Sequence, residues 1–360
     1  MNREAFFRFI SPEHLYFVAS LFGMATACIV IMIFVFLYTK KRRFRMQSRI
    51  ADKLNEWIGE ALSESEVAHI TVPPDIATML KKSSFRQFAI DSLISVKKSV
   101  TGSMADSIVH LYQLLDLKKD SVKRFKSMEW YSRARGIYEL YMMQQHDYQQ
   151  AIMKYTNSNN EYVRMEAQTA IIGFAGFKGL VFLDNLTHSL NEWQQIKLLE
   201  QLETLNVEEM EGLPGWLRST NDYVVQFALK LADIFQQLQV HNQVVACLSH
   251  RKIKIRYQAI KSLGRIANED TNSLLRQMYY AEEVANRMEI LRQLSVIGTV
   301  DDVPFLTDQL HENDDRLKLE AGRAIVNLIG DDGLMVIQEQ AGDSKRMESI
   351  FNQIKFEMAL

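Results

Sequence analysis

A long apolar run from Leu15 to Thr39 stands apart from the mixed polar and apolar pattern of the rest of the chain. The run has no charged residue over 25 positions. As an α-helix it would be roughly 37 Å long, enough to cross the ~30 Å hydrocarbon core of a bilayer. A buried core helix of this length would show a polar face, and a cleaved signal peptide would be shorter, with its basic residues in front. The pattern therefore predicts a retained transmembrane helix over residues 15–39.

The charges on either side of the run predict its orientation. Residues 1–14 carry two basic and two acidic residues, which cancel. Under the positive-inside rule, the basic side of a span stays in the cytoplasm. We therefore expect a short tail outside an inner or plasma membrane, and the bulk of the chain inside. The basic side is also the expected membrane interface, where it could bind anionic headgroups. It consists of Lys40, Lys41, Arg42, Arg43, Arg45 and Arg49.

Beyond this anchor, apolar residues recur every three or four positions, which is typical of helices. The pattern over residues 40–74 predicts a basic juxtamembrane helix that continues the anchor, followed by a linker that contains Pro73 and Pro74. Residues 75–157 predict a membrane-proximal helical region without a visible repeat.

A repeat of 30–31 residues begins near residue 158 and predicts a stacked array up to residue 360. Its clearest copy is Ile255–Ala267. A unit of this length has room for two short helices, and one such hairpin cannot bury both of its faces, so neighbouring units must stack. Pro214 and Pro304, three repeats apart, are expected to open the first helices of their units. A small or apolar residue marks the equivalent buried position in each copy: Ala167, Leu198, Ala228, Ala259, Ile290 and Ala321.

The pattern [VI]-R-x-x-A-x-x-x-L-G-x-I, with an Asp and a second helix after it, resembles HEAT repeats of the short kind seen in phycobilin-lyase-like proteins. The resemblance implies an all-α, right-handed solenoid whose second helices line a concave surface that binds protein partners; it does not imply lyase activity. An anchor joined to such an array also resembles membrane-tethered HEAT proteins of bacteria, which accompany envelope or polysaccharide-synthesis machinery.

The family often places an Asp four residues before the conserved Arg, as a ladder between units. Here those positions hold Asn160, Asn221, Lys252, Glu283 and Asp314, so only two of the five are acids. The basic residues themselves are therefore either ladder residues or exposed contacts for a partner. They are Arg164, Arg256, Arg287 and Lys318.

Composition and charge narrow the function further. The chain is 47% hydrophobic and 24% charged, with only 5 prolines and 15 glycines, which suits a folded helical protein. Two cysteines in separate segments predict no disulfide. Residues 81–135 are basic and residues 136–360 acidic. An acidic array excludes nucleic acid as the main partner, and the basic region is either a lipid-facing surface or an ordinary solvated face.

No catalytic pattern stands out. The sequence lacks a phosphate-binding glycine loop and an H-E-x-x-H zinc motif. His241, Cys247 and His250 have the residue types of a zinc site, but we interpret them as solvated turn residues. The acid pairs at 301–302, 314–315 and 331–332 fall at expected helix starts, where aspartates cap free N–H groups.

The sequence thus predicts a non-catalytic, membrane-tethered scaffold or adaptor without cofactor, metal or small-molecule substrate. Its partners would be membrane-associated proteins, together with membrane lipid at the anchor and the basic flank. The alternative is a dedicated regulatory subunit of a membrane enzyme, such as a polysaccharide-synthesising glycosyltransferase.

Overall fold

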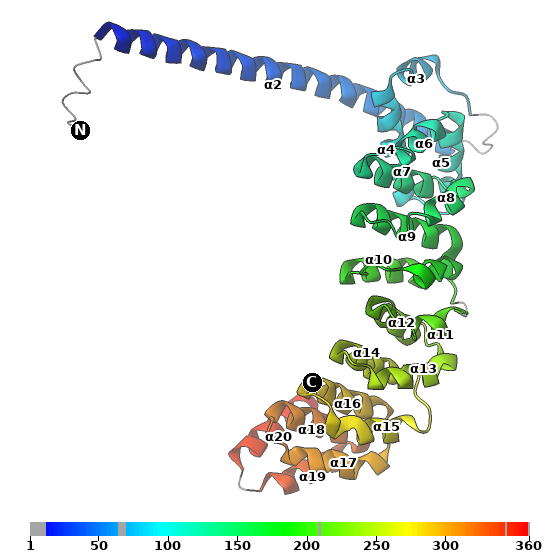
Figure 1. The fold of residues 1–360 in the computed structure, drawn as a ribbon, viewed down its shortest axis with the longest axis vertical. Coiled ribbons are helices and arrows are strands. Elements are labelled where there is room, and N and C mark those ends of the chain that lie inside the picture. The colour runs from blue at the N-terminus through cyan, green and yellow to red at the C-terminus, as the bar shows by residue number, and fades with distance from the viewer. Residues whose placement is uncertain (1–11, 64–69, 208–209, 343, 359–360) are drawn as a thin grey trace. The chain divides into compact units, whose positions relative to one another are not determined.

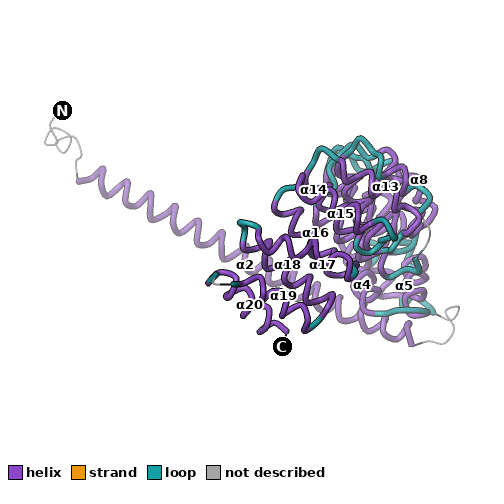
Figure 2. Tube along the Cα trace, turned by 90° about the horizontal axis from the view of Figure 1, so that it is seen from below, coloured by secondary structure: helices purple, strands orange, loops and turns teal. Residues whose placement is uncertain are grey.

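The computed structural model describes residues 12–63, 70–207, 210–342 and 344–358; for residues 12–15, 18 and 39–51 it describes the backbone alone. Every regular element in these ranges is a helix (Figure 2). The chain divides into two compact units, Met1–Val122 and Lys123–Leu360. The boundary expected near residue 158 marks where the sequence repeat begins, which is a different property from the boundary between compact units. It stays a prediction.

The first unit is built on one long helix, α2, that runs from Pro12 to Ser63 without a break. The apolar stretch Ala19–Tyr38 within it buries none of its surface. The last turns are different: Leu54, Trp57 and Ile58 are buried. Three further helices complete the packing of this unit: α3 (Pro74–Met79), α4 (Ser83–Ser99) and α5 (Ser103–Leu114).

The unbroken α2 agrees with the expected continuity of the anchor and the juxtamembrane helix. The exposed apolar part could be a signal sequence or a single membrane anchor. Glu161–Asn185 also has the length and composition of a membrane span, but most of it is buried in the second unit, as in the core of a soluble domain. The side chains of the basic cluster Lys40–Arg49 and most of the linker lie outside the described residues.

The second unit is a solenoid of stacked helices in two layers, which form two columns in Figure 1. Neighbouring helices of the first layer contact each other along the stack, for example α14 with α16 and α16 with α18. This layer consists of α7 (Trp130–Met142), α9 (Glu161–Ala175), α10 (Glu192–Glu203), α12 (Asp222–Ile234), α14 (Ile253–Leu263), α16 (Val284–Ile297), α18 (Asp315–Ile329) and α20 (Lys345–Met358).

The second layer is made of shorter helices, several of them continued by 3-10 turns. Helix α6 (Lys118–Phe125) spans the boundary between the two units. The α-helices of the layer are α8 (Gln149–Met153), α11 (Leu213–Trp216), α13 (His241–Ala246), α15 (Thr271–Met278), α17 (Val303–Asp308) and α19 (Asp331–Ala341). The 3-10 segments are η2 (His146–Tyr148), η3 (Gly176–Asn185), η4 (Leu238–Val240), η5 (Cys247–Ser249), η6 (Tyr279–Ala281), η7 (Val300–Asp302) and η8 (Gln309–His311).

Local chemistry explains where these helices start and stop. The side chains of Asn160, Asn191 and Asn221 each accept a backbone N–H in the first turn of the helix that follows. Gly176 and Gly330 end α9 and α18 at φ +56° and +61°, a conformation that residues with a Cβ rarely adopt.

One placement differs from the sequence expectation. Pro214 and Pro304 do open helices, but these are α11 and α17, in the second layer rather than the first. Proline suits the first turn of any helix because its missing N–H would be unsatisfied there anyway, so proline spacing alone could not assign the layer.

Candidate functional site

The six repeat-marking residues form the contact line of the first layer. Each lies on a first-layer helix and is fully buried: Ala167, Leu198, Ala228, Ala259, Ile290 and Ala321. All of them except Ala167 belong to a continuous apolar core that extends from Ile172 to Ile354. Their role is packing, and they offer nothing to a ligand.

The basic residues of the repeat pattern are turned inward. Arg256 on α14 donates two hydrogen bonds to the carboxylate of Glu282, at 2.6 and 3.0 Å, and one to the carbonyl of His250 at 3.0 Å. Arg287 on α16 donates one hydrogen bond to Glu312, and its guanidinium lies 4.4 Å from the centroid of the Tyr279 ring. Both arginines thus tie a first-layer helix to the loop that leads to the next one.

Arg164 and Lys318 are also engaged within the chain. Arg164 is buried and donates to the carbonyl of Ser158 at 2.6 Å, and burial lowers the pKa of its guanidinium. Lys318 lies 3.6 Å from Asp315 on its own helix, with a side chain that is mostly buried. Arg256 and Arg287 thus fit the interpretation as links between units, whereas the contacts of Arg164 and Lys318 stay next to or within their own helices.

The five positions at which the family would place ladder acids are helix N-caps. The side chain of Asp314 accepts the backbone N–H of Arg316, as those of Asn160 and Asn221 do in their own helices. The acids that pair with Arg256 and Arg287 are Glu282 and Glu312, which come just before the expected positions. A rule that requires an acid at a fixed spacing from the arginine misses an acid that lies one or two residues earlier in the loop.

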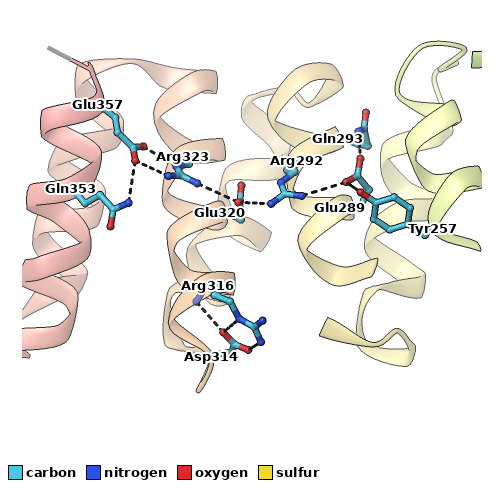
Figure 3. Close-up of polar contacts among 10 residues, drawn as sticks. All are labelled: Tyr257, Glu289, Arg292, Gln293, Asp314, Arg316, Glu320, Arg323, Gln353 and Glu357. Carbon is cyan, nitrogen blue, oxygen red and sulfur yellow. Dashed lines mark hydrogen bonds and ion pairs between the residues drawn. The ribbon is translucent and has the colours of Figure 1, made fainter. Parts of the chain in front are cut away.

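A second polar row crosses the first layer farther along the helices and was not anticipated from the sequence (Figure 3). Tyr257 on α14 donates to Glu289 on α16 at 2.8 Å, and Arg292 donates to Glu320 on α18 at 2.9 Å. Arg323 then holds both Glu320, at 3.2 Å, and Glu357 on α20, at 2.6 and 2.8 Å.

This row has a sequence signature. Glu289 and Arg292 recur 31 residues later as Glu320 and Arg323, so a search for charged residues within the repeat would have found it. The Arg323 guanidinium lowers the pKa of Glu357 to about 2. Because each charge already faces a charge of opposite sign, the row is a stabilising network rather than a reactive site.

Of the paired acids, Asp302 and Asp314 act as helix caps, whereas α19 has no side-chain cap. Asp302 accepts the backbone N–H of Thr299 at 2.9 Å within a capping box. It is buried and also accepts from Asn272 at 3.0 Å and Arg276 at 2.6 Å, which links α15 to the next unit. Asp331 and Asp332 lie in the first turn of α19.

The zinc interpretation fails on geometry, and so does the view that its residues are solvated. His241 and Cys247 are buried, because η4 and α13 pack onto the core. The Nε2 atom of His241 lies 3.0 Å from the Thr271 hydroxyl, and the Cys247 thiol faces the carbonyl of Leu217. His250 instead contacts Asp222 at 3.5 Å. Among the described residues no group of three metal-binding side chains comes together.

One cavity of about 500 Å³ opens between η3 and α11. Its wall includes Phe177, Met210 and Trp216, and the indole N–H of Trp216 donates to Asp184 at 2.6 Å. The lining has one lysine and two acids beside its apolar residues.

Comparison with known proteins assigns the repeat. Residues 242–326 match the family model of HEAT repeats. These residues lie within the all-α solenoid of the second unit, so this part of the solenoid is built of HEAT repeats. A search of curated protein sequences finds no match.

Several solved structures share this general architecture at a distance. An engineered protein is 12% identical with a TM-score of 0.37, over 85% of this chain and 99% of its own. The CpcE–CpcF complex of phycocyanin lyase from Nostoc sp. PCC7120 is 13% identical with a TM-score of 0.26, over 81% of this chain and 96% of its own. Human deoxyhypusine hydroxylase is 13% identical with a TM-score of 0.28, over 86% and 96%. Likenesses this distant carry no information about function.

Proposed function

We propose that this protein is a non-catalytic scaffold or adaptor, held at a membrane by α2 and binding protein partners through its solenoid. HEAT repeats generally mediate protein–protein binding, and the match over residues 242–326 is the observation that carries the proposal. The anchor brings the solenoid and its membrane partners into a shared plane, which raises their effective concentration, so a modest affinity suffices.

The membrane part of the proposal rests on α2. The 20-residue stretch Ala19–Tyr38 has a mean hydropathy of 2.5 and no buried residue, and an exposed apolar surface of this size needs lipid or protein to cover it. The helix continues without interruption to Ser63, into turns that pack against the rest of the first unit. A retained anchor explains this continuity better than a cleaved signal sequence does.

Topology is tested with reporters fused at Leu360. We expect a reporter that is active only outside the cytoplasm to be silent there, and a cytoplasmic reporter to be active. Mass measurement of the membrane-extracted protein should find residues 1–40 still attached. An active external reporter would reverse the orientation, and loss of the N-terminal segment would show that it is a signal sequence.

Partner binding is tested by affinity purification from detergent-solubilised membranes. A scaffold should retain several proteins in varying ratios, whereas a dedicated subunit of a membrane enzyme, such as a glycosyltransferase, should retain one at fixed stoichiometry. Recovery of the chain without any protein partner would contradict both roles.

A further inference from the structure

A row of exposed aromatic side chains marks the starts of four consecutive first-layer helices. Each is the second residue of its helix, and the steps between them follow the repeat. They are Tyr131, Tyr162, Trp193 and Tyr223, exposed by 57%, 60%, 70% and 46%. At the same position the later helices carry Lys254, Ala285 and Arg316, so the aromatic row is confined to α7–α12.

In three of these helices an acid directly precedes the ring, which gives the acid–aromatic pairs Glu161–Tyr162, Glu192–Trp193 and Asp222–Tyr223. The acid alone has a structural explanation, because a carboxylate in the first turn opposes the helix dipole. The ring has no such explanation, because it caps nothing and stays largely exposed, although Tyr162 stacks one face on Trp130 with ring centroids 5.1 Å apart. Trp193, the most exposed of the four, shows this most clearly.

The third pair shows what such a pair can bind, because the chain fills it with its own lysine. The Lys252 ammonium forms an ion pair with Asp222 and lies 6.0 Å from the centroid of the Tyr223 ring. A cation above an aromatic face and beside a carboxylate is attracted by both. Asp222 responds to this lysine with a lowered pKa.

The first two pairs lack this internal lysine. Lys252 is the N-cap of α14, and the equivalent N-caps of α10 and α12 are Asn191 and Asn221. Asn191 donates to one carboxylate oxygen of Glu161 at 2.8 Å, which leaves the other oxygen available. Asparagine brings no charge, so these two pairs keep their carboxylates without a lysine at that position.

We propose that Glu161–Tyr162 and Glu192–Trp193 bind two lysine or arginine side chains of an extended basic segment in a partner protein. The inference rests on the proposed scaffold function and names the surface and the chemistry of the partner. This surface lies on the first layer, whereas the family resemblance pointed to the second helices. The acids next to the rings disfavour phosphate-bearing ligands, so the surface suits neither anionic lipid nor nucleic acid.

The spacing of the pairs restricts the conformation of the segment. Packed helices lie about 8–10 Å apart, so the two pairs on α9 and α10 are separated by about that distance. A polyproline II segment advances ~3.1 Å per residue and returns to the same face every third residue, about 9 Å on. A β-strand would turn a residue three positions away to the opposite face. The partner segment should therefore carry its basic residues with the spacing Lys-x-x-Lys.

The test uses the full chain in detergent and a fluorescent peptide, Lys-Pro-Pro-Lys-Pro-Pro-Lys, followed by fluorescence anisotropy. Two control peptides are required: one with norleucine for lysine, and one of the same composition with its lysines contiguous. We expect the spaced lysine peptide to bind tighter than both. The double variant Glu192→Gln, Trp193→Ala should lose about tenfold in affinity, while Trp193→Phe should retain most of it because the aromatic face remains.

The matched control is Asp315→Asn, since Asp315 occupies the same helix position as Glu192 but precedes an arginine rather than a ring. It should leave peptide affinity unchanged. All variants should keep the melting temperature of the wild type, because the altered side chains are exposed. Equal binding of the norleucine peptide, or equal losses in the double variant and in Asp315→Asn, would overturn the proposal.

The same double variant separates this proposal from the scaffold function. If partners co-purify with the wild type and the variant alike while peptide binding falls, the assignment of this surface to those partners is wrong and the scaffold role stands. If no partner co-purifies with the wild type, the scaffold role fails, and the peptide measurement still decides whether the acid–aromatic pairs bind cations.

Discussion

The two halves of the solenoid join their helices by different chemistry. Between α14 and α20 the links are mostly charged, through Arg256, Arg287, Arg292 and Arg323 and their acids. Between α9 and α12 they are mostly amides and caps. The side chain of Gln168 donates to the carbonyl of Thr156 at 2.9 Å and accepts from Gln194 at 3.2 Å, and Asn221 donates to the carbonyl of Leu186 at 2.7 Å.

The difference is not absolute, since Lys197 and Glu166 lie 3.6 Å apart in the amide-linked half. It does coincide with the sequence match, because the HEAT family matches 242–326 and not the units before it. It also coincides with the aromatic row, which occupies α7–α12 alone. The comparison teaches that one backbone arrangement tolerates two kinds of link, provided the apolar contact line is kept.

The largest effect should come from breaking that shared contact line. Ala259→Lys would bury an unpaired charge in a fully buried position and overpack α14 against its neighbours. We expect a loss of about 3 kcal/mol or more in the stability of the surrounding units. Lys261→Gln, on the exposed side of the same helix, should stay within ~0.5 kcal/mol. Thermal unfolding followed by circular dichroism measures both; equal shifts would refute the assigned packing.

Removing a buried amide should cost less and should not respond to salt. Gln168→Leu keeps an apolar volume but leaves the Thr156 carbonyl without its donor, at a cost of about 1–3 kcal/mol. Hydrogen exchange of α9 amides, measured at low salt and at about 0.5 M salt, should show the same loss of protection. A loss that shrank with added salt would mean that charge also stabilises this half.

Breaking a charged link should have a smaller effect that does respond to salt. Arg323→Gln removes the bonds to Glu320 and Glu357, and the pair with Glu357 is partly exposed. We expect about 0.5–1 kcal/mol, seen as faster exchange in α20, with wild type and variant converging at high salt. Asn327→Ala, one turn further on the same helix, serves as the uncharged comparison. No convergence would argue that the row acts through packing.

The smallest effect concerns acid. Arg323 lowers the pKa of Glu357 to about 2 from 4.5, so its stabilising contribution is complete above pH 4.5 and is lost as the pH falls toward 2. Asp233 on α12 behaves oppositely: burial raises its pKa, so acid relieves the cost of its charge. The protection of α20 amides, corrected for the intrinsic exchange rate at each pH, should therefore fall on acidification before the protection of α12 amides does. Glu357→Gln should remove the pH dependence in α20; an unchanged dependence would assign it to other carboxylates.

The sequence was sufficient for whatever depends on local periodicity. Apolar spacing and a 31-residue period, anchored on residues such as Ala259 and Ala321, predicted stacked helical hairpins, because a helix must bury one stripe and a repeat must bury it against its neighbour. The length of the charge-free run likewise predicted an apolar helix that its own chain does not cover. Turn chemistry predicted Asp314 and Asp302 at helix starts.

Other features were decided only by the tertiary structure, because they depend on which side chains from different units meet. The family spacing put the ladder acid at Glu283, while the loop brings Glu282 to Arg256. Burial of His241 and Cys247 follows from how α13 packs onto the core, which no local pattern records. The row from Tyr257 to Glu357 and the lysine over Tyr223 require helices about 30 residues apart in sequence to lie side by side, and that proximity exists only once the repeats have stacked.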